Sequence, residues 1–160
     1  MKVKTGGETF KVYITVDITG KYPKVVPDVT DEELKKNGNL QRWWAEFIRW
    51  DWISLNQILK EARVENVVTG RRDIDFQSMR ELKLRKLLKD WSLEEDGKKI
   101  KVKRDENGLT EESWKEVISV DFAVLTAFLN KADLVLELGQ EEESDFIKVS
   151  PQLSVPAETK

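Results

Sequence analysis

The sequence predicts an α+β fold in which a small, mainly antiparallel sheet packs against three principal helices. Apolar and polar residues alternate from Phe10 to Ile18, which is the pattern of a half-buried strand. Apolar residues recur with a period near that of a helix in three later stretches, which are expected to be helices over 40–63, 78–91 and 110–131. The length of 160 residues suits one domain with a sizeable core.

The expected domain organisation follows from the composition along the chain. Residues 1–8 contain Gly6-Gly7 and no apolar run, so a flexible N-terminal arm is expected there. The single α+β domain is expected over 9–139. Residues 140–160 begin with an acidic run and continue into a segment with two prolines, which indicates a poorly ordered tail.

After the first strand, proline and capping residues divide the chain into short elements. Pro23 and Pro27 cannot donate to a β-ladder, so a turn followed by an edge strand or an extended loop is expected around them. Thr30 precedes an acidic turn and Glu33 lies three residues further on, a capping box that begins a short helix. That helix is expected to end near Asn37.

Four of the six tryptophans lie between residues 40 and 63, where the sequence favours one long helix or two helices with a break near 51–54. Tryptophan is enriched in interfaces because its large ring also carries a hydrogen-bond donor. The candidate partner interface therefore consists of Trp43, Trp44, Trp50 and Trp52. The alternative is that all four pack in the core of the domain, since burial is the usual fate of aromatic side chains.

A second candidate surface lies on the helix expected at 78–91 and on the segment after it. Leucines and Trp91 form one apolar stripe that is expected to dock this helix, and the basic residues lie largely away from that stripe. Asp96-Gly97 suits a turn that leads into a strand with one charged face. The candidate basic face comprises Arg80, Lys83, Lys86, Lys89, Lys101 and Lys103. It is either a phosphate-contacting surface or a solvated face, because interleaved acidic residues weaken its field.

The remaining stretches carry weaker signals. Residues 65–76 are expected to be a polar, mobile connection around Gly70. Thr110 is expected to cap the helix over 110–131. Beyond that helix, the alternating leucines favour either a last helical turn or an exit strand: Leu134, Leu136 and Leu138.

The composition excludes several classes of chemistry. The chain has no cysteine and no histidine, which removes disulfides, thiolate chemistry, the Ser-His-Asp arrangement and the commonest zinc ligands. Acidic residues are numerous, but neighbours such as Asp73 and Asp75 form no matched acid–base pair and lack the other ligands of a calcium loop. No catalytic, metal-binding or cofactor-binding residue is predicted, and we expect no enzyme.

The net charge and the hydropathy of the chain limit the classes of partner that are expected. The net charge of −3 opposes a general attraction to nucleic acid or to anionic membranes. No apolar run reaches the roughly 20 residues of a membrane span, and the N-terminus lacks a signal-peptide pattern. A soluble protein made inside the cell, with no membrane partner, is expected.

One part of the chain resembles a known family. Residues 82–100 (LKLRKLLKDWSLEEDGKKI), then 108–114 (GLTEESW) and the apolar helix to Leu129, are similar to small proteins encoded in the structural gene clusters of tailed bacteriophages. In those proteins a helix ends in a Trp-Ser/Asn-Leu step, passes an acidic turn with Asp-Gly, and reaches a second helix that begins near a leucine and an acidic pair. The resemblance covers about residues 76–136.

This resemblance implies a non-enzymatic, protein-binding role in bacteriophage tail or virion assembly, as a tail assembly chaperone or a minor structural protein. The implied partners are other phage tail or virion proteins, such as the tape measure, or further copies of the chain. The implied location is the host cytoplasm during assembly, or the virion. The alternative function is a nucleic-acid-binding module that uses the basic helix 80–89 and the ribbon 98–104. An enzyme that uses carboxylates is a third hypothesis, supported only by their number.

Overall fold

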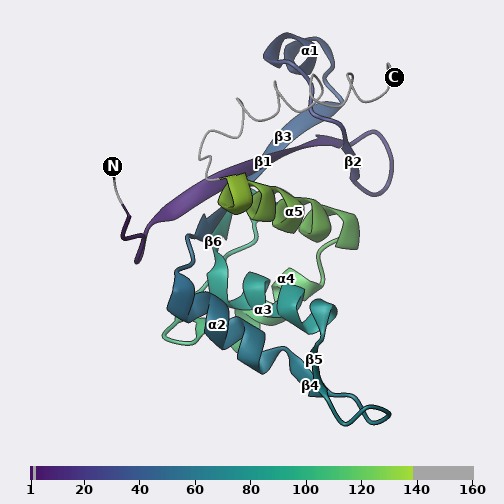
Figure 1. Ribbon diagram of the computed structural model, residues 1–160. Coiled ribbons are helices and arrows are strands. Elements are labelled where there is room, and N and C mark those ends of the chain that lie inside the picture. Colours follow the sequence, from purple (N-terminus) through teal and green to yellow (C-terminus); the bar gives the residue numbers. More distant parts are fainter. Residues whose placement is uncertain (2, 139–160) are drawn as a thin grey trace, which may run out of the picture. The chain divides into compact units, whose positions relative to one another are not determined.

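The computed structural model describes residue 1 and residues 3–138, and it has an α+β fold with a mainly antiparallel sheet. The main sheet has the strand order β2-β1-β3-β6 (Figure 1). Its strands are β1 (Thr9–Asp17), β2 (Lys24–Val26), β3 (Leu40–Ile48) and β6 (Leu88–Trp91). The described residues divide into two compact units, one formed by 1–10 and 45–120 and the other by 11–44 and 121–138.

The unit that contains residues 11–44 and 121–138 is built on β1 and β2. These strands pair antiparallel with Val16 opposite Val25, and α5 (Phe122–Leu138) contacts β2. The hydroxyl of buried Thr15 donates to Asp28, which also forms an ion pair with Lys131 of α5. The short helix α1 (Asp31–Lys36) begins at Thr30, whose Oγ1 accepts the Glu33 N–H at 3.2 Å.

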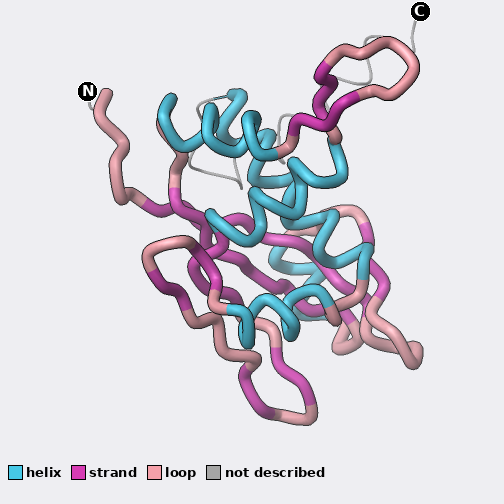
Figure 2. Tube along the Cα trace, turned by 90° about the horizontal axis from the view of Figure 1, so that it is seen from below, coloured by secondary structure: helices cyan, strands magenta, loops and turns pink. Residues whose placement is uncertain are grey.

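The other unit contains three helices and four small strand pairings. α2 (Trp52–Glu61) packs against α3 (Phe76–Leu87), and the β4–β5 hairpin (Arg63–Glu65 and Arg72–Ile74) connects them. Residues 45–47 of β3 pair antiparallel with β6, with a bulge between Glu46 and Phe47. Two further hairpins precede α4 (Glu111–Ile118): β7 (Glu94–Glu95) with β8 (Lys98–Lys99), and β9 (Arg104–Asp105) with β10 (Gly108–Leu109). Figure 2 separates these helices, strands and loops by colour.

Several predicted elements are confirmed. The first strand runs from Thr9 to Asp17, and β2 is an edge strand of the main sheet. Thr30 and Thr110 both cap helices, and the Ser113 N–H donates to Thr110 Oγ1 at 3.3 Å. The turn at Asp96-Gly97 has positive φ at both residues, 51° and 76°.

The helix predicted over 40–63 was wrong in its first half. Residues 40–48 form strand β3, and only Trp52–Glu61 is helical. Ala45 and Phe47 are fully buried two residues apart, which is the spacing of one face of a strand. An apolar run of this length fits both periods, and pairing with β6 decides between them.

The helices predicted over 78–91 and 110–131 also needed correction. The first ends at Leu87, because residues 88–91 leave the helix to pair with β3 as strand β6. The second is broken between α4 and α5, where the Asp121 carboxylate accepts the Ala123 N–H at 3.0 Å and begins α5. Leu134 and Leu136 lie in α5, so this stretch is helix and not an exit strand.

Two loop predictions were revised as well. The polar connection expected over 65–76 contains most of the β4–β5 hairpin, whose turn is closed by Gly70 at φ 67°. The charged strand expected after Asp96-Gly97 is limited to Lys98–Lys99. Residue 139 and the tail predicted over 140–160 lie outside the described residues.

Candidate functional site

The four candidate tryptophans do not share one helix face. Trp43 and Trp44 lie on β3, Trp50 follows the strand, and Trp52 begins α2. The Lys11 ammonium lies 4.0 Å from the centroid of the Trp44 ring, and the Lys83 ammonium lies 5.3 Å from that of Trp50. These cation–π contacts cover part of both rings. Trp52 is the most exposed of the four.

The first turn of α2 presents two large apolar side chains to solvent. Trp52 is 79% exposed and Ile53 is 66% exposed, whereas Ile58 on the opposite side of the same helix is fully buried. Asp51 caps this turn, because its carboxylate accepts the Ser54 N–H at 2.8 Å. That hydrogen bond lowers the pKa of the Asp51 carboxyl from its usual value. We call Trp52 and Ile53 the α2 apolar turn.

The basic residues of α3 do not form a continuous basic surface. Lys83 is only 9% exposed, against the expectation that the bases of this helix face water. Lys86 forms an ion pair with Glu61 of α2 at 2.6 Å. Lys89 is exposed, but it lies on β6 and not on the helix. Arg80 is half-buried. The predicted basic face is therefore not one surface: Lys83 and Lys86 take part in contacts of α3, and Lys89 lies on strand β6.

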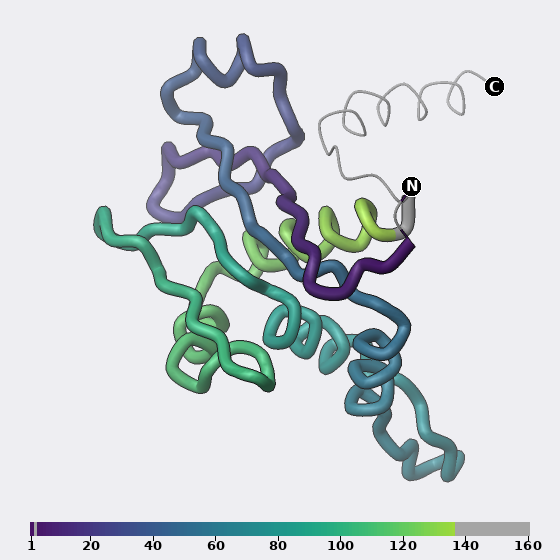
Figure 3. The backbone as a smooth tube through the Cα atoms, turned by 90° about the vertical axis from the view of Figure 1, so that its left-hand side faces the viewer, coloured from purple at the N-terminus to yellow at the C-terminus, as the bar shows by residue number. Residues whose placement is uncertain are grey.

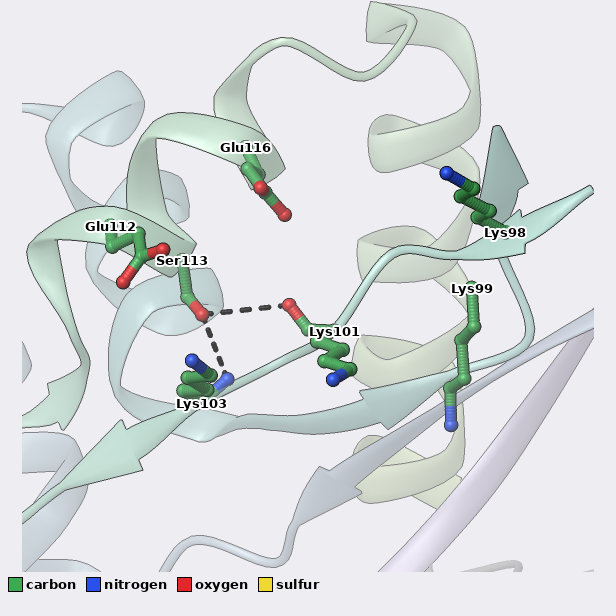
Figure 4. A pocket seen from close by; sticks show the side chains of 7 residues that line it. All are labelled: Lys98, Lys99, Lys101, Lys103, Glu112, Ser113 and Glu116. Atoms are coloured by element: carbon green, nitrogen blue, oxygen red, sulfur yellow. Dashed lines mark hydrogen bonds between the residues drawn. The ribbon is translucent and has the colours of Figure 1, made fainter. Parts of the chain in front are cut away.

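The two other candidate bases, Lys101 and Lys103, line a cavity of about 460 Å³ that we call the lysine pocket (Figure 4). Its lining consists of Lys98, Lys99, Lys101, Lys103, Glu112, Ser113 and Glu116. The lining thus contains four lysines and two glutamates, and Lys99 forms an ion pair with Asp90, which lies outside the lining, at 2.9 Å. The local charge remains positive.

Ser113 lies on α4 and joins this helix to residues 101–103, which line the pocket. Its side chain is 3% exposed, and its Oγ accepts the Lys103 N–H at 2.8 Å and donates to the Lys101 carbonyl at 3.5 Å. The dashed lines in Figure 4 show both interactions. Residues 100–103 belong to no strand. The two hydrogen bonds to Ser113 nevertheless fix the backbone positions of Lys101 and Lys103.

Trp91 and Arg104 form hydrogen bonds at the two ends of the segment 100–104. The Trp91 indole N–H donates to the Ile100 carbonyl at 2.9 Å. The Arg104 guanidinium donates to the Lys86 and Leu88 carbonyls at 2.7 Å each, which satisfies the C-terminal end of α3. Burial lowers the pKa of Arg104, and the nearby Asp105 carboxylate opposes that shift.

Sequence reasoning placed Lys101 and Lys103 in a basic ribbon but did not find the partners that make the pocket. Glu112 and Glu116 read as ordinary exposed residues of a helix, and their four-residue spacing is the one available signal that they share a face. Ser113 carried no signal, because its burial depends on a segment that lies ten residues earlier.

Among the described residues, no three acidic side chains lie close enough to hold a metal ion. No helix within residues 3–138 is both long and apolar enough to cross a membrane. Comparisons with protein-family models, with curated proteins and with solved structures found no match to this chain.

Proposed function

We propose that this chain is a non-enzymatic protein-binding module that acts in bacteriophage tail or virion assembly, as a tail assembly chaperone or a minor structural protein. The observation that carries the protein-binding part is the α2 apolar turn, where Trp52 is 79% exposed beside Ile53. The phage setting rests on the resemblance over residues 76–136. The place of action is then the host cytoplasm during assembly, or the virion.

The α2 apolar turn has the properties of a binding hot spot. A tryptophan that contacts a partner through most of its ring buries a large apolar area at a small cost in side-chain entropy. The Asp51 cap and the packing of α2 on α3 hold the turn in place before a partner binds. The partner that fits is an apolar segment of another tail or virion protein, because the α2 apolar turn offers little hydrogen bonding apart from the indole N–H.

The test is to express the chain together with the products of its neighbouring genes and to measure binding to those that co-purify. Trp52→Ala should raise the dissociation constant about thirtyfold or more, since hot-spot truncations cost about 2 kcal/mol or more. Phe122→Ala is the matched control, because Phe122 is also an exposed aromatic residue (72%) at the start of a helix.

Binding that survives Trp52→Ala unchanged would contradict the role of the α2 apolar turn. Failure of every neighbouring product to bind the wild-type chain would contradict the assembly role itself.

Nucleic-acid binding is the second candidate, and the lysine pocket is the observation that favours it. Three lysines there extend from one short segment without an ion pair to a described residue: Lys98, Lys101 and Lys103. Fluorescence anisotropy with single-stranded and double-stranded oligonucleotides should then show affinity that falls steeply with salt. A Lys101→Gln/Lys103→Gln double variant should bind more weakly, and Lys35→Gln/Lys36→Gln on α1 should not. Absence of binding by the wild-type chain at low ionic strength would end this candidate.

A further inference from the structure

The β4–β5 hairpin extends beyond the ends of α2 and α3 (Figures 2 and 3). Among the strands of residues 3–138 it forms a two-stranded sheet by itself, so both of its edges carry backbone groups without a described neighbouring strand. Its apolar side chains are exposed: Val64 by 48%, Val67 by 96% and Val68 by 94%. An isolated two-stranded hairpin is marginally stable in water, and additional strands stabilise it.

The register of the hairpin shows which backbone groups point to the open edge of β4. The Asn66 N–H donates to the Arg71 carbonyl at 2.7 Å, and the Asp75 N–H donates to the Ala62 carbonyl at 2.8 Å. Since hydrogen-bonding residues alternate along an antiparallel strand, Val64 also bonds towards β5. The N–H and C=O groups of Arg63 and Glu65 therefore point outwards.

The charges along this edge are complementary to themselves. If two β4 strands pair antiparallel about a two-fold axis at Val64, Arg63 of each copy lies opposite Glu65 of the other. Both are outward-bonding residues, so they form the hydrogen-bonded pairs, and the two Val64 residues form the non-hydrogen-bonded pair between them. The β5 edge lacks this property, because the same pairing there would put two Asp73 carboxylates opposite each other.

We propose that two copies of this chain associate through the open edges of β4 to form a continuous antiparallel sheet of four strands, β5-β4-β4-β5. The occupant of this edge is thus a second copy. On one face Arg72, Glu65 and Arg63 of the second copy alternate in charge across neighbouring strands. The exposed valines of each turn lie beside the base of the other hairpin. This interface is separate from the α2 apolar turn.

A single introduced cysteine tests the two-fold axis directly, because the chain has none of its own. Residues in a non-hydrogen-bonded antiparallel pair have Cα atoms about 4.5 Å apart, within the range of a disulfide. Val64→Cys should therefore oxidise to a covalent dimer at low protein concentration. Val68→Cys is the matched control: it is more exposed, but its two copies would lie more than about 20 Å apart. Equal cross-linking of both variants would overturn the proposed register.

Charge reversal tests the edge pairing by light scattering over a range of protein concentrations. Arg63→Glu or Glu65→Arg replaces two attractive pairs with two repulsive ones, so each should shift dimerisation to about tenfold higher concentration. The double variant Arg63→Glu/Glu65→Arg restores opposite charges between the two β4 strands and should dimerise at lower concentration than either single variant, although the arginine introduced at position 65 then lies opposite Arg72. An equimolar mixture of the two single variants should form the mixed dimer. Arg71→Glu, in the turn, is the control with the same charge change.

A wild-type chain that stays monomeric up to its solubility limit would overturn the proposal. A dimer that single reversals leave unchanged would place self-association on another surface, which also overturns it. Neither result bears on binding of a different protein by the α2 apolar turn, so the two proposals fail independently.

Discussion

At the scale of single residues, Gly108 is the described glycine at which an added Cβ atom would meet its surroundings most closely. Its φ is 115°, and a Cβ atom there would lie 2.5 Å from the Arg85 carbonyl oxygen at the end of α3. Gly108→Ala should therefore lower the free energy of unfolding by about 2 kcal/mol or more, because it adds both backbone strain and a backbone clash.

Urea unfolding followed by circular dichroism measures this change. Gly38→Ala is the control, since a Cβ at Gly38 meets nothing within 4 Å. Equal stability of the two variants would contradict the close approach of β10 to α3.

Arg104 is the second residue whose replacement has a specific expected cost. Arg104→Met keeps the length and apolar character of the side chain but leaves the Lys86 and Leu88 carbonyls without their donor. The free energy of unfolding should fall by about 2 kcal/mol, as expected when part-buried carbonyls lose charge-assisted hydrogen bonds. Arg104→Lys should recover only part of it, because a single ammonium does not reproduce the guanidinium fork. Full recovery with lysine would show that charge alone stabilises this end of α3.

At the scale of elements, the carboxylate caps of α2 and α3 make the stability of these helices depend on pH in the acidic range. The pKa of Asp51 is lowered by the backbone N–H of Ser54, and that of Asp75 by the hydroxyl of Ser78. The folded-state pKa of each carboxyl therefore lies below its unfolded value of about 3.9. This contribution to stability is present above that unfolded pKa, and it is lost as the pH falls through the folded pKa.

An NMR titration of the Asp51 carboxyl should accordingly give a midpoint below about 3.9. Asp51→Asn keeps a capping oxygen without the ionisable group, so its free energy of unfolding should fall less than that of the wild type between neutral pH and about pH 2. A midpoint at or above the unfolded value would mean that the carboxylate does not cap α2 in solution.

The elements also show where sequence patterns were sufficient. Strand β1 and the caps at Thr30 and Thr110 depend on contacts within a few residues, so local pattern predicted them. Strand β3 was predicted as helix, because the adjacent pairs Trp43-Trp44 and Phe47-Ile48 satisfy both periods over a short run. Pairing with β6, more than forty residues later, decided in favour of the strand.

At the scale of the whole molecule, opposite charges nearly cancel. The chain has 27 basic and 30 acidic residues, and its isoelectric point is about 5.3. Net repulsion between molecules is weakest near that pH, so solubility should pass through a minimum there and rise on both sides. Turbidity of concentrated protein between about pH 4 and 8 measures this dependence. A minimum far from pH 5.3 would indicate that a local patch, such as the lysine pocket, dominates association.

The sequence by itself determined the α+β class, the first strand, the helix caps and the kinds of chemistry that the chain lacks, because composition and short-range periodicity are properties of neighbouring residues. Only the tertiary structure decided that the Lys83 ammonium lies over the Trp50 ring, that Trp52 remains exposed, that Ser113 bonds to the segment lining the lysine pocket and that β4 pairs with β5 alone among the described strands. Each of these depends on segments distant in the chain that meet or fail to meet, and no local pattern records which of the alternatives minimises the free energy of the folded protein.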